Sequence, residues 1–170
     1  MADPKPRSET RSLFGNDTIL FNSRTLADFG SGEVAKITFP NEIASVKAGK
    51  EGNTIYVQNV TGHQAVLEIK VIRGSADDHY FLDKVKGYKN YPALYVLDTA
   101  QLIKFIGSGL SITGGPDDAP NTGKQSSDKY TLNHGIPTKQ QDVITNLDGD
   151  TEQAIAVYTW TFAHCDRTYG

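Results

Sequence analysis

The amino-acid sequence predicts a mainly β protein with one helix. Sixteen glycines and seven prolines among 170 residues favour short strands joined by turns over a bundle of helices. Several segments alternate apolar and polar side chains with a period of two, as strands buried on one face do. Only one segment combines helical spacing with helix-end signals. The length suits a single domain over residues 1–170, and no repeat or linker divides the sequence.

Five strands are expected, in residues 18–22, 33–39, 54–60, 65–72 and 152–164. In the first two, the apolar faces are formed by Ile19 and Phe21, and by Ala35, Ile37 and Phe39. The segment AVLEIKVI (65–72) shows the pattern most clearly, because three aliphatic side chains share one face while Glu68 and Lys70 lie on the other. A glycine-containing turn at 61–63 separates 54–60 from 65–72, so these two segments are expected to pair as a β-hairpin.

The last expected strand, 152–164, is apolar on more than one side. One face carries Ala154, Ala156, Tyr158, Trp160 and Phe162. In the first half of the segment, Ile155 and Val157 make the other face apolar as well. A strand covered on both faces indicates a packed sandwich or burial against another subunit.

The expected helix covers residues 75–87. Ser75 is a good N-cap, and Asp78 partly completes a capping box, which more often uses Glu or Gln. The apolar stripe consists of Phe81, Leu82 and Val85. Gly87 is expected to end the helix, because glycine favours the position just after a helix C-terminus.

The remaining segments give weaker signals. Residues 1–16 are expected to form a flexible N-terminal arm, and residues 107–129, rich in Gly, Ser, Asp and Pro, a long loop. Residues 94–106 fit either two successive strands or a partly helical segment. Two weak strand candidates and a turn follow, at 130–133, 140–145 and 146–150.

Charge and cysteine content exclude several classes of partner. The net charge of −3 comes without a stripe of Lys and Arg, so stable binding to nucleic-acid phosphates is not expected. The lone Cys165 excludes an intrachain disulfide framework and a cysteine-rich zinc site. The histidines are scattered at positions 63, 79, 134 and 164, without metal-ligand spacing. We therefore expect no metal and no cofactor.

The motif search gives no catalytic residues, so we do not expect an enzyme. ITGGPDD (112–118) lacks the lysine of a phosphate-binding loop, and NLDGDTE (146–152) lacks the terminal glutamate of a calcium loop. Asp77 and Asp78 are neighbours that do not face each other on a helix and suit its positive end. His164 and Cys165 would point to opposite faces of a strand.

Targeting and membrane signals are not found in the sequence. The start, MADPKPRSETRSLFG, is polar and has no apolar core of a secretory signal. No apolar run approaches the ~18 residues of a membrane span. We expect no membrane insertion by this chain and a cytoplasmic place of folding.

One stretch resembles the tail tube proteins of tailed bacteriophages. It is EGNTIYVQNVTGHQAVLEIKVIRGSADDHYFLDKVKG (51–87), with a polar turn, a strand, a Thr-Gly turn, a second strand and a Gly-Ser-x-Asp-Asp helix start. ITFPNEI (37–43) and AVYTWTFAHCD (156–166) are similar to the first and last strands of that family. The family also includes the tubes of contractile tails, pyocin-like particles and secretion needles.

The resemblance implies an antiparallel β-sandwich or partly closed barrel with one flanking helix, long loops and an N-terminal arm. Six copies would form a ring, and rings would stack through the arm, a long loop and the C-terminal segment into a conduit for the genome. The implied partners are other copies of the chain, tape measure, baseplate and terminator proteins, and the sheath if the tail is contractile. Assembly would take place in the cytoplasm of the host bacterium, and the product would be part of the virion tail.

DNA would pass through the lumen without specific binding, which suits a mildly acidic chain. Glu68 and Lys70 are candidate lumen residues because they lie on the polar face of their strand. Two other classes stay open beside the tube subunit. The first is a sandwich-type module that binds a carbohydrate or a peptide, and the second is an enzyme without a recognisable motif.

Overall fold

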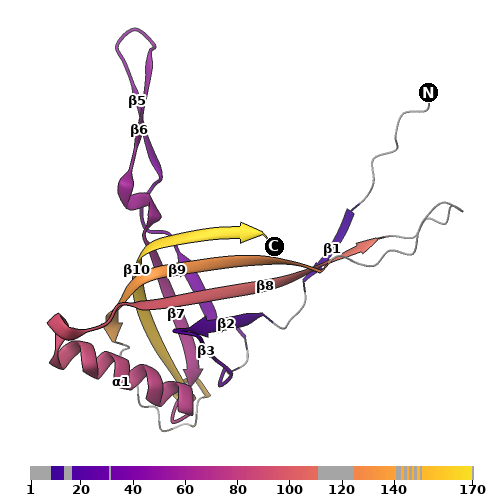
Figure 1. The fold of residues 1–170 in the computed structure, drawn as a ribbon, viewed down its shortest axis with the longest axis vertical. Coiled ribbons are helices and arrows are strands. Elements are labelled where there is room, and N and C mark those ends of the chain that lie inside the picture. Colours follow the sequence, from indigo (N-terminus) through magenta and orange to yellow (C-terminus); the bar gives the residue numbers. More distant parts are fainter. Residues whose placement is uncertain are drawn as a thin grey trace, which may run out of the picture.

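The computed structural model describes residues 9–13, 17–30, 32–110, 125–140, 143, 145, 147, 149 and 151–169. It shows a curled antiparallel sheet, a half-barrel, with one helix against it and a two-stranded ribbon that projects from it (Figure 1). The expected fold class is confirmed in its partly closed barrel form.

The strands are β1 (Glu9–Leu13), β2 (Thr18–Phe21), β3 (Arg24–Thr25), β4 (Ala35–Thr38), β5 (Ala44–Ala48), β6 (Thr54–Gln58), β7 (Ala65–Ile72), β8 (Asp98–Leu110), β9 (Gln125–Gln140) and β10 (Ile155–Tyr169). The helix is α1 (Ala76–Asn90), and short 3₁₀ turns are η1 (Val60–His63), η2 (Pro92–Leu94) and η3 (Thr151–Ala154). The main sheet has the order β3-β2-β8-β9-β10-β7-β4, and β1 pairs with the far half of β8.

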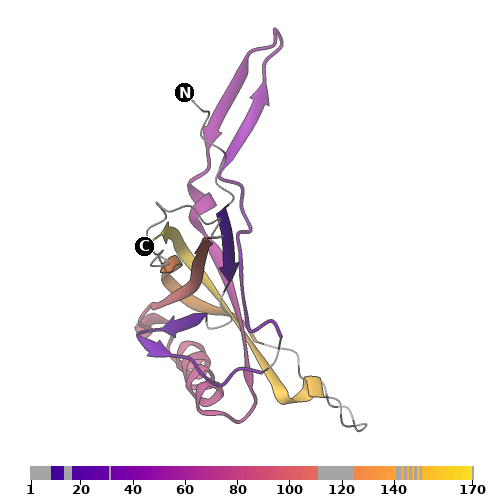
Figure 2. The same cartoon turned by 90° about the vertical axis from the view of Figure 1, so that its right-hand side faces the viewer.

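The core lies between the sheet and α1, which covers one face of the sheet (Figure 2). Its largest fully buried side chains are Trp160, Phe21, Phe81 and Phe162. Phe21 meets Phe81 and Trp160 edge to face, with ring centroids 5.0 and 5.2 Å apart. The alternation of the expected strands is confirmed here, because every second residue of β2, β7 and most of β10 is buried in this core.

Helix α1 begins as expected and ends later than expected. The Ser75 hydroxyl accepts a hydrogen bond from the Asp78 N–H, and the Asp78 carboxylate accepts one from the Gly74 N–H. The helix passes through Gly87 to Asn90, so the expected stop at Gly87 is wrong. The helix can pass through Gly87 because one glycine destabilises an exposed helix by only about 1 kcal/mol. It ends at Asn90 because the next residue precedes Pro92, and a residue before proline is disfavoured in helical geometry.

The apolar stripe of α1 is narrower than expected. Phe81 and Val85 are buried, but Leu82 is only half-buried. At the edges of two other expected strands, Phe39 and Ala154 lie outside the strand and are exposed. The predicted buried faces are therefore confirmed within these strands, but not for the residues at their ends.

The expected hairpin between 54–60 and 65–72 is wrong. β6 pairs with β5, with Val46 opposite Tyr56, in a separate two-stranded sheet. β7 is bound on both edges, by β4 and by β10, so it has no free edge for β6. The turn η1 separates the two strands without folding them onto each other.

The second half of the chain contains longer strands than expected. β8 and β9 pair from Asp98 opposite Gly135 to Gly107 opposite Gln125, and the two strands extend into the expected loop 107–129 at both of its ends. β9 also includes the weak candidate 130–133. Of the candidate 140–145, the structure describes only residues 140, 143 and 145, and of these only residue 140 lies in a strand. Residues 9–13 of the expected flexible arm form β1. Residues 1–8, 14–16 and 111–124 lie outside the described part of the chain.

Candidate assembly surface

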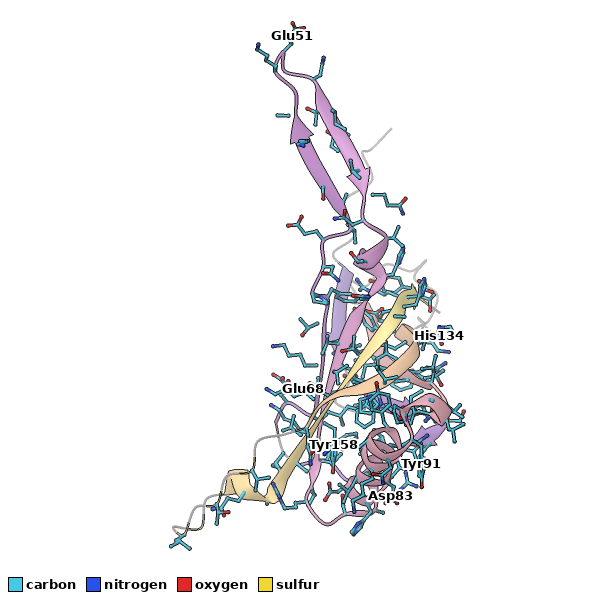
Figure 3. The ribbon with its side chains drawn as sticks, turned by 90° about the vertical axis from the view of Figure 1, so that its left-hand side faces the viewer. Glu51, Glu68, Asp83, Tyr91, His134 and Tyr158 are labelled. Atoms are coloured by element: carbon cyan, nitrogen blue, oxygen red, sulfur yellow. The ribbon has the colours of Figure 1, made fainter. Side chains whose placement is uncertain are left out.

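The ribbon formed by β5 and β6 stands away from the body of the protein (Figures 1 and 3). All residues of both strands are exposed. Val46 and Tyr56 face each other on one side of the ribbon and are 66% and 75% exposed. Ile55 and Val57, on the other side, are 55% and 52% exposed. The ribbon therefore presents apolar side chains on both of its faces.

The two legs of the ribbon are joined at its base. The Asn59 N–H donates to the Ile43 carbonyl at 3.0 Å, and the Asn59 side-chain amide donates to the Glu42 carbonyl and the Ser45 hydroxyl. Gly62 packs so closely that a Cβ there would lie 2.7 Å from the Ile43 Cα. These contacts hold the two legs of the ribbon together where they enter and leave it.

A second exposed apolar surface follows α1. We call residues 91–97 the connector, because they join α1 to β8. Its large apolar side chains are Tyr91, Leu94, Val96 and Leu97, of which Leu94 is 80% exposed. The connector lies beside the C-terminal end of α1, on the left-hand side of Figure 1, away from the ribbon.

The main sheet ends in open edges. Within the part of the chain that the structure describes, β4 pairs with β7 on one side only, and β3, at the other end of the order, pairs with β2 alone. The outer backbone groups of such strands can pair with a strand of another chain. The sheet is thus curled but not closed within one copy.

The sheet face opposite α1 is mixed, because it carries Glu68 and Lys70 together with the aliphatic Ile72, Ile155 and Val157. Glu68 lies on the side of the sheet away from Asp83 of α1 (Figure 3). It lies between Lys36 of β4 and Thr159 of β10, and Lys139 of β9 lies beyond Thr159 in register. Lys70 is half-buried on the same face, 4.0 Å from Glu33. Both expected lumen residues therefore lie on the sheet face opposite α1.

Asp77 connects α1 to the segment after β3 through hydrogen bonds of its carboxylate. Its carboxylate accepts hydrogen bonds from the Ala27 and Asp28 N–H groups at 2.9 and 3.0 Å and lies 3.1 Å from Arg24. Burial by itself would raise the pKa of Asp77, but the hydrogen bonds from Asp28 and Ala27, together with Arg24, outweigh it and lower the pKa. The neighbouring Asp78 has different partners, among them the Tyr158 hydroxyl. The two carboxylates do not form a pair.

A second buried carboxylate, Asp98, was not singled out by the sequence. It is fully buried at the start of β8 and accepts hydrogen bonds from Asn22 and Trp160, with Lys84 3.1 Å away. These residues lie far apart in the chain, so no local pattern could have indicated the cluster. Farther along the sheet, Arg167 holds the buried Asp128 with two nitrogen atoms.

Two of the scattered histidines meet in the fold. The rings of His63, in η1, and His164, in β10, stack 4.9 Å apart, and His164 Nδ1 lies 3.3 Å from Asp166. Within the described ranges, no group of three or more His, Cys, Asp or Glu residues is placed to hold a metal ion. Cys165 is half-buried, and burial, followed by the nearby Asp166, raises the pKa of its thiol to about 11.

A hollow of about 250 Å³ opens beside the turn between β2 and β3. It is lined by uncharged residues of β2, β8, β9 and this turn, among them Asn22, Gln101, Thr131 and Asn133. Of the motifs rejected in the sequence, 112–118 lies outside the described residues and 146–152 is described only in part. In the described part of the chain, the helix α1 is too short and polar to cross a membrane.

Comparisons with known proteins give a distant structural likeness. No family model matches the sequence, and no curated protein matches it. A cryo-EM structure of the sheath/tube terminator of an extracellular contractile injection system (PVC), in the extended state, is similar with a TM-score of 0.46 and 12% sequence identity. The likeness covers 92% of this chain and 94% of that one. It is too distant to carry a functional argument.

Proposed function

We propose that this protein is a structural subunit that assembles with copies of itself into a tail tube. The observation that carries this proposal is the β5–β6 ribbon. A two-stranded ribbon is marginally stable in water without a surface to pack on, and this ribbon has exposed apolar side chains on both faces. It becomes stable when another chain covers it.

The open edges of the curled sheet support closure by symmetry. A half-barrel with unpaired edge strands can continue into the sheet of the next copy, and cyclic symmetry then removes the exposed edges. We propose six copies in each ring, as the resemblance of residues 51–87 implies. In the structure this stretch covers β6, η1, β7 and most of α1, and so includes half of the ribbon and the strand next to the β4 edge of the sheet.

The sheet face opposite α1, which carries Glu68 and Lys70, is the proposed wall of the channel. Glu68, Lys70, Lys36 and Thr159 give it mixed charges and hydroxyl groups instead of a basic stripe. Because affinity for DNA comes mainly from cationic contacts to phosphates, such a wall would let DNA pass without holding it. In this proposal the chain has no catalytic role, and its partners in the tail are tape measure, baseplate and terminator proteins, with a sheath if the tail is contractile.

Electron microscopy of the purified full-length protein tests this function. We expect rings or tubes of uniform diameter in negative stain at high protein concentration. Light scattering after size exclusion should show a large species that dissociates on dilution. A protein that stays monomeric at high concentration, also when mixed with tail terminator or baseplate components, would contradict the proposal. If that monomer binds a glycan or a peptide on an array, the binding-module alternative holds instead.

A further inference from the structure

The buried Asp98 divides its two oxygen atoms between two kinds of partner. Oδ2 accepts hydrogen bonds from Trp160 Nε1, at 2.9 Å, and from the Tyr95 hydroxyl. Oδ1 accepts a hydrogen bond from Asn22 Nδ2 at 2.7 Å and lies 3.1 Å from Lys84 Nζ. One oxygen is thus held by fixed donors, while the other brings an amine and a carboxamide together.

The carboxamide of Asn22 is held in one orientation. Its Oδ1 accepts a hydrogen bond from the Thr99 N–H at 2.9 Å, and its Nδ2 also donates to the Tyr80 hydroxyl at 3.2 Å. The backbone of Asn22, with φ of 50°, is part of the tight turn between β2 and β3 and donates to the Thr99 carbonyl. The side-chain nitrogen therefore faces Asp98, and the side-chain oxygen faces a backbone donor.

The surroundings of this cluster are aromatic and poor in water. Lys84 Nζ lies 5.9 Å from the centre of the Tyr80 ring and 5.8 Å from that of Tyr95. The side chain of Asp98 is 1% exposed and that of Lys84 29%. A buried ion pair carries the desolvation cost of two charges. Transfer of a proton from Nζ to Oδ1 leaves two neutral groups and an amine that can act as a nucleophile.

We propose that Lys84 and Asn22 join in an intramolecular isopeptide bond, with Asp98 as the carboxyl group that transfers the protons. Asp98 Oδ1 takes a proton from Nζ, and the amine lone pair attacks the Asn22 side-chain carbonyl carbon. Negative charge develops on Asn22 Oδ1, which faces the Thr99 N–H, as an oxyanion requires.

The second half of the reaction releases nitrogen from Asn22. Asp98 gives its proton to Nδ2 and takes one from the new amide nitrogen. The bond between Nδ2 and the carbon then breaks, and the ammonia that leaves takes the proton that Asp98 holds. The products are a Lys–Asn amide, an ammonium ion and the original Asp98 carboxylate, so no oxidant or other co-reactant is needed. The bond would tie the turn between β2 and β3 to α1, independently of assembly.

The intact mass of the purified full-length protein tests this inference. Loss of one ammonia is expected to lower the mass by about 17 Da from that of the sequence. Tandem mass spectrometry of a protease digest should identify one branched peptide that contains both Asn22 and Lys84. The matched control is Lys84→Arg, which keeps a cation beside Asp98 but cannot form this amide and should show the full mass.

Two results would overturn the inference. One is an unchanged mass after prolonged incubation of protein whose buried Trp160 fluorescence shows that it is folded. The other is a loss of ammonia that persists in Lys84→Arg, or that maps to peptides without Lys84, because a succinimide at another asparagine gives the same mass change. The peptide map of the unsubstituted protein decides the question even if the control variant folds poorly.

Discussion

Replacing Ile55 and Val57 together by serine should abolish assembly and leave the single chain folded. Both side chains lie on the same face of the ribbon, since they are two residues apart in a strand. Full burial of such a side chain stabilises by about 1.5–3 kcal/mol. In the single chain each is only about half buried, at 55% and 52% exposed, so covering the pair adds about 1.5–3 kcal/mol per contact.

This free energy sets the size of the expected effect. Because ~1.4 kcal/mol is a factor of ten in an equilibrium constant, each contact should weaken by about 10- to 150-fold. Sedimentation velocity over a dilution series measures the shift toward monomer, and negative-stain images show whether rings persist. Thermal unfolding followed by circular dichroism should be unchanged, since neither side chain belongs to the core.

The matched control is Lys47→Ser, which changes a polar side chain on the same face of the ribbon, opposite Ile55. It should assemble as the unsubstituted protein does. Rings that form at unchanged concentrations with the double substitution would refute the assignment of this face to an interface. A large drop in the thermal midpoint would instead show that the ribbon packs against the body of its own chain.

Four more predictions concern the core, the charges and the N-terminal strand. Phe81→Ala should lower the free energy of unfolding by about 3–5 kcal/mol in urea titrations, because the ring is fully buried. Leu82→Ala should lower this free energy clearly less, because Leu82 is only half-buried. Equal losses in the two variants would contradict the orientation of α1. Because folding lowers the pKa of Asp77, the charged carboxylate stabilises the folded state above the ordinary carboxyl pKa, and this contribution is lost as the pH falls below about 4. In Asp77→Asn, the free energy of unfolding should therefore fall less steeply as the pH is lowered. The same acid dependence in both proteins would show that folding does not lower the pKa of Asp77. Cys165, with a pKa of about 11, should react with a thiol reagent at pH 8 far more slowly in the folded than in the urea-unfolded protein, and equal rates would exclude its burial. Deletion of residues 1–15 removes β1 and should shorten tubes more than it lowers the thermal midpoint, an expectation that tubes of normal length would rule out.

The candidate surface was only partly visible in the sequence. The segment TIYVQ places apolar side chains on both faces of one strand. This pattern differs from that of a strand that buries one face and exposes the other. The sequence thus shows that β6 is apolar on both faces, but it does not show that β6 pairs with β5 away from the core. The partner strand and the distance from the core depend on the rest of the fold. The Asp98 cluster gave no signal at all, since Asn22, Lys84 and Asp98 belong to three separate elements.

What the sequence by itself determined was local. Alternation set the buried faces of β2, β7 and β10, and Ser75 set the start of α1, because side-chain direction and capping depend on residues within a few positions of each other. Only the tertiary structure decided which strands pair, how far β8 and β9 extend, and that β6 leaves the sheet with β5. Backbone hydrogen bonds in a sheet join any two strands of suitable geometry, so the choice of partner depends on which edges are free once the whole chain has packed.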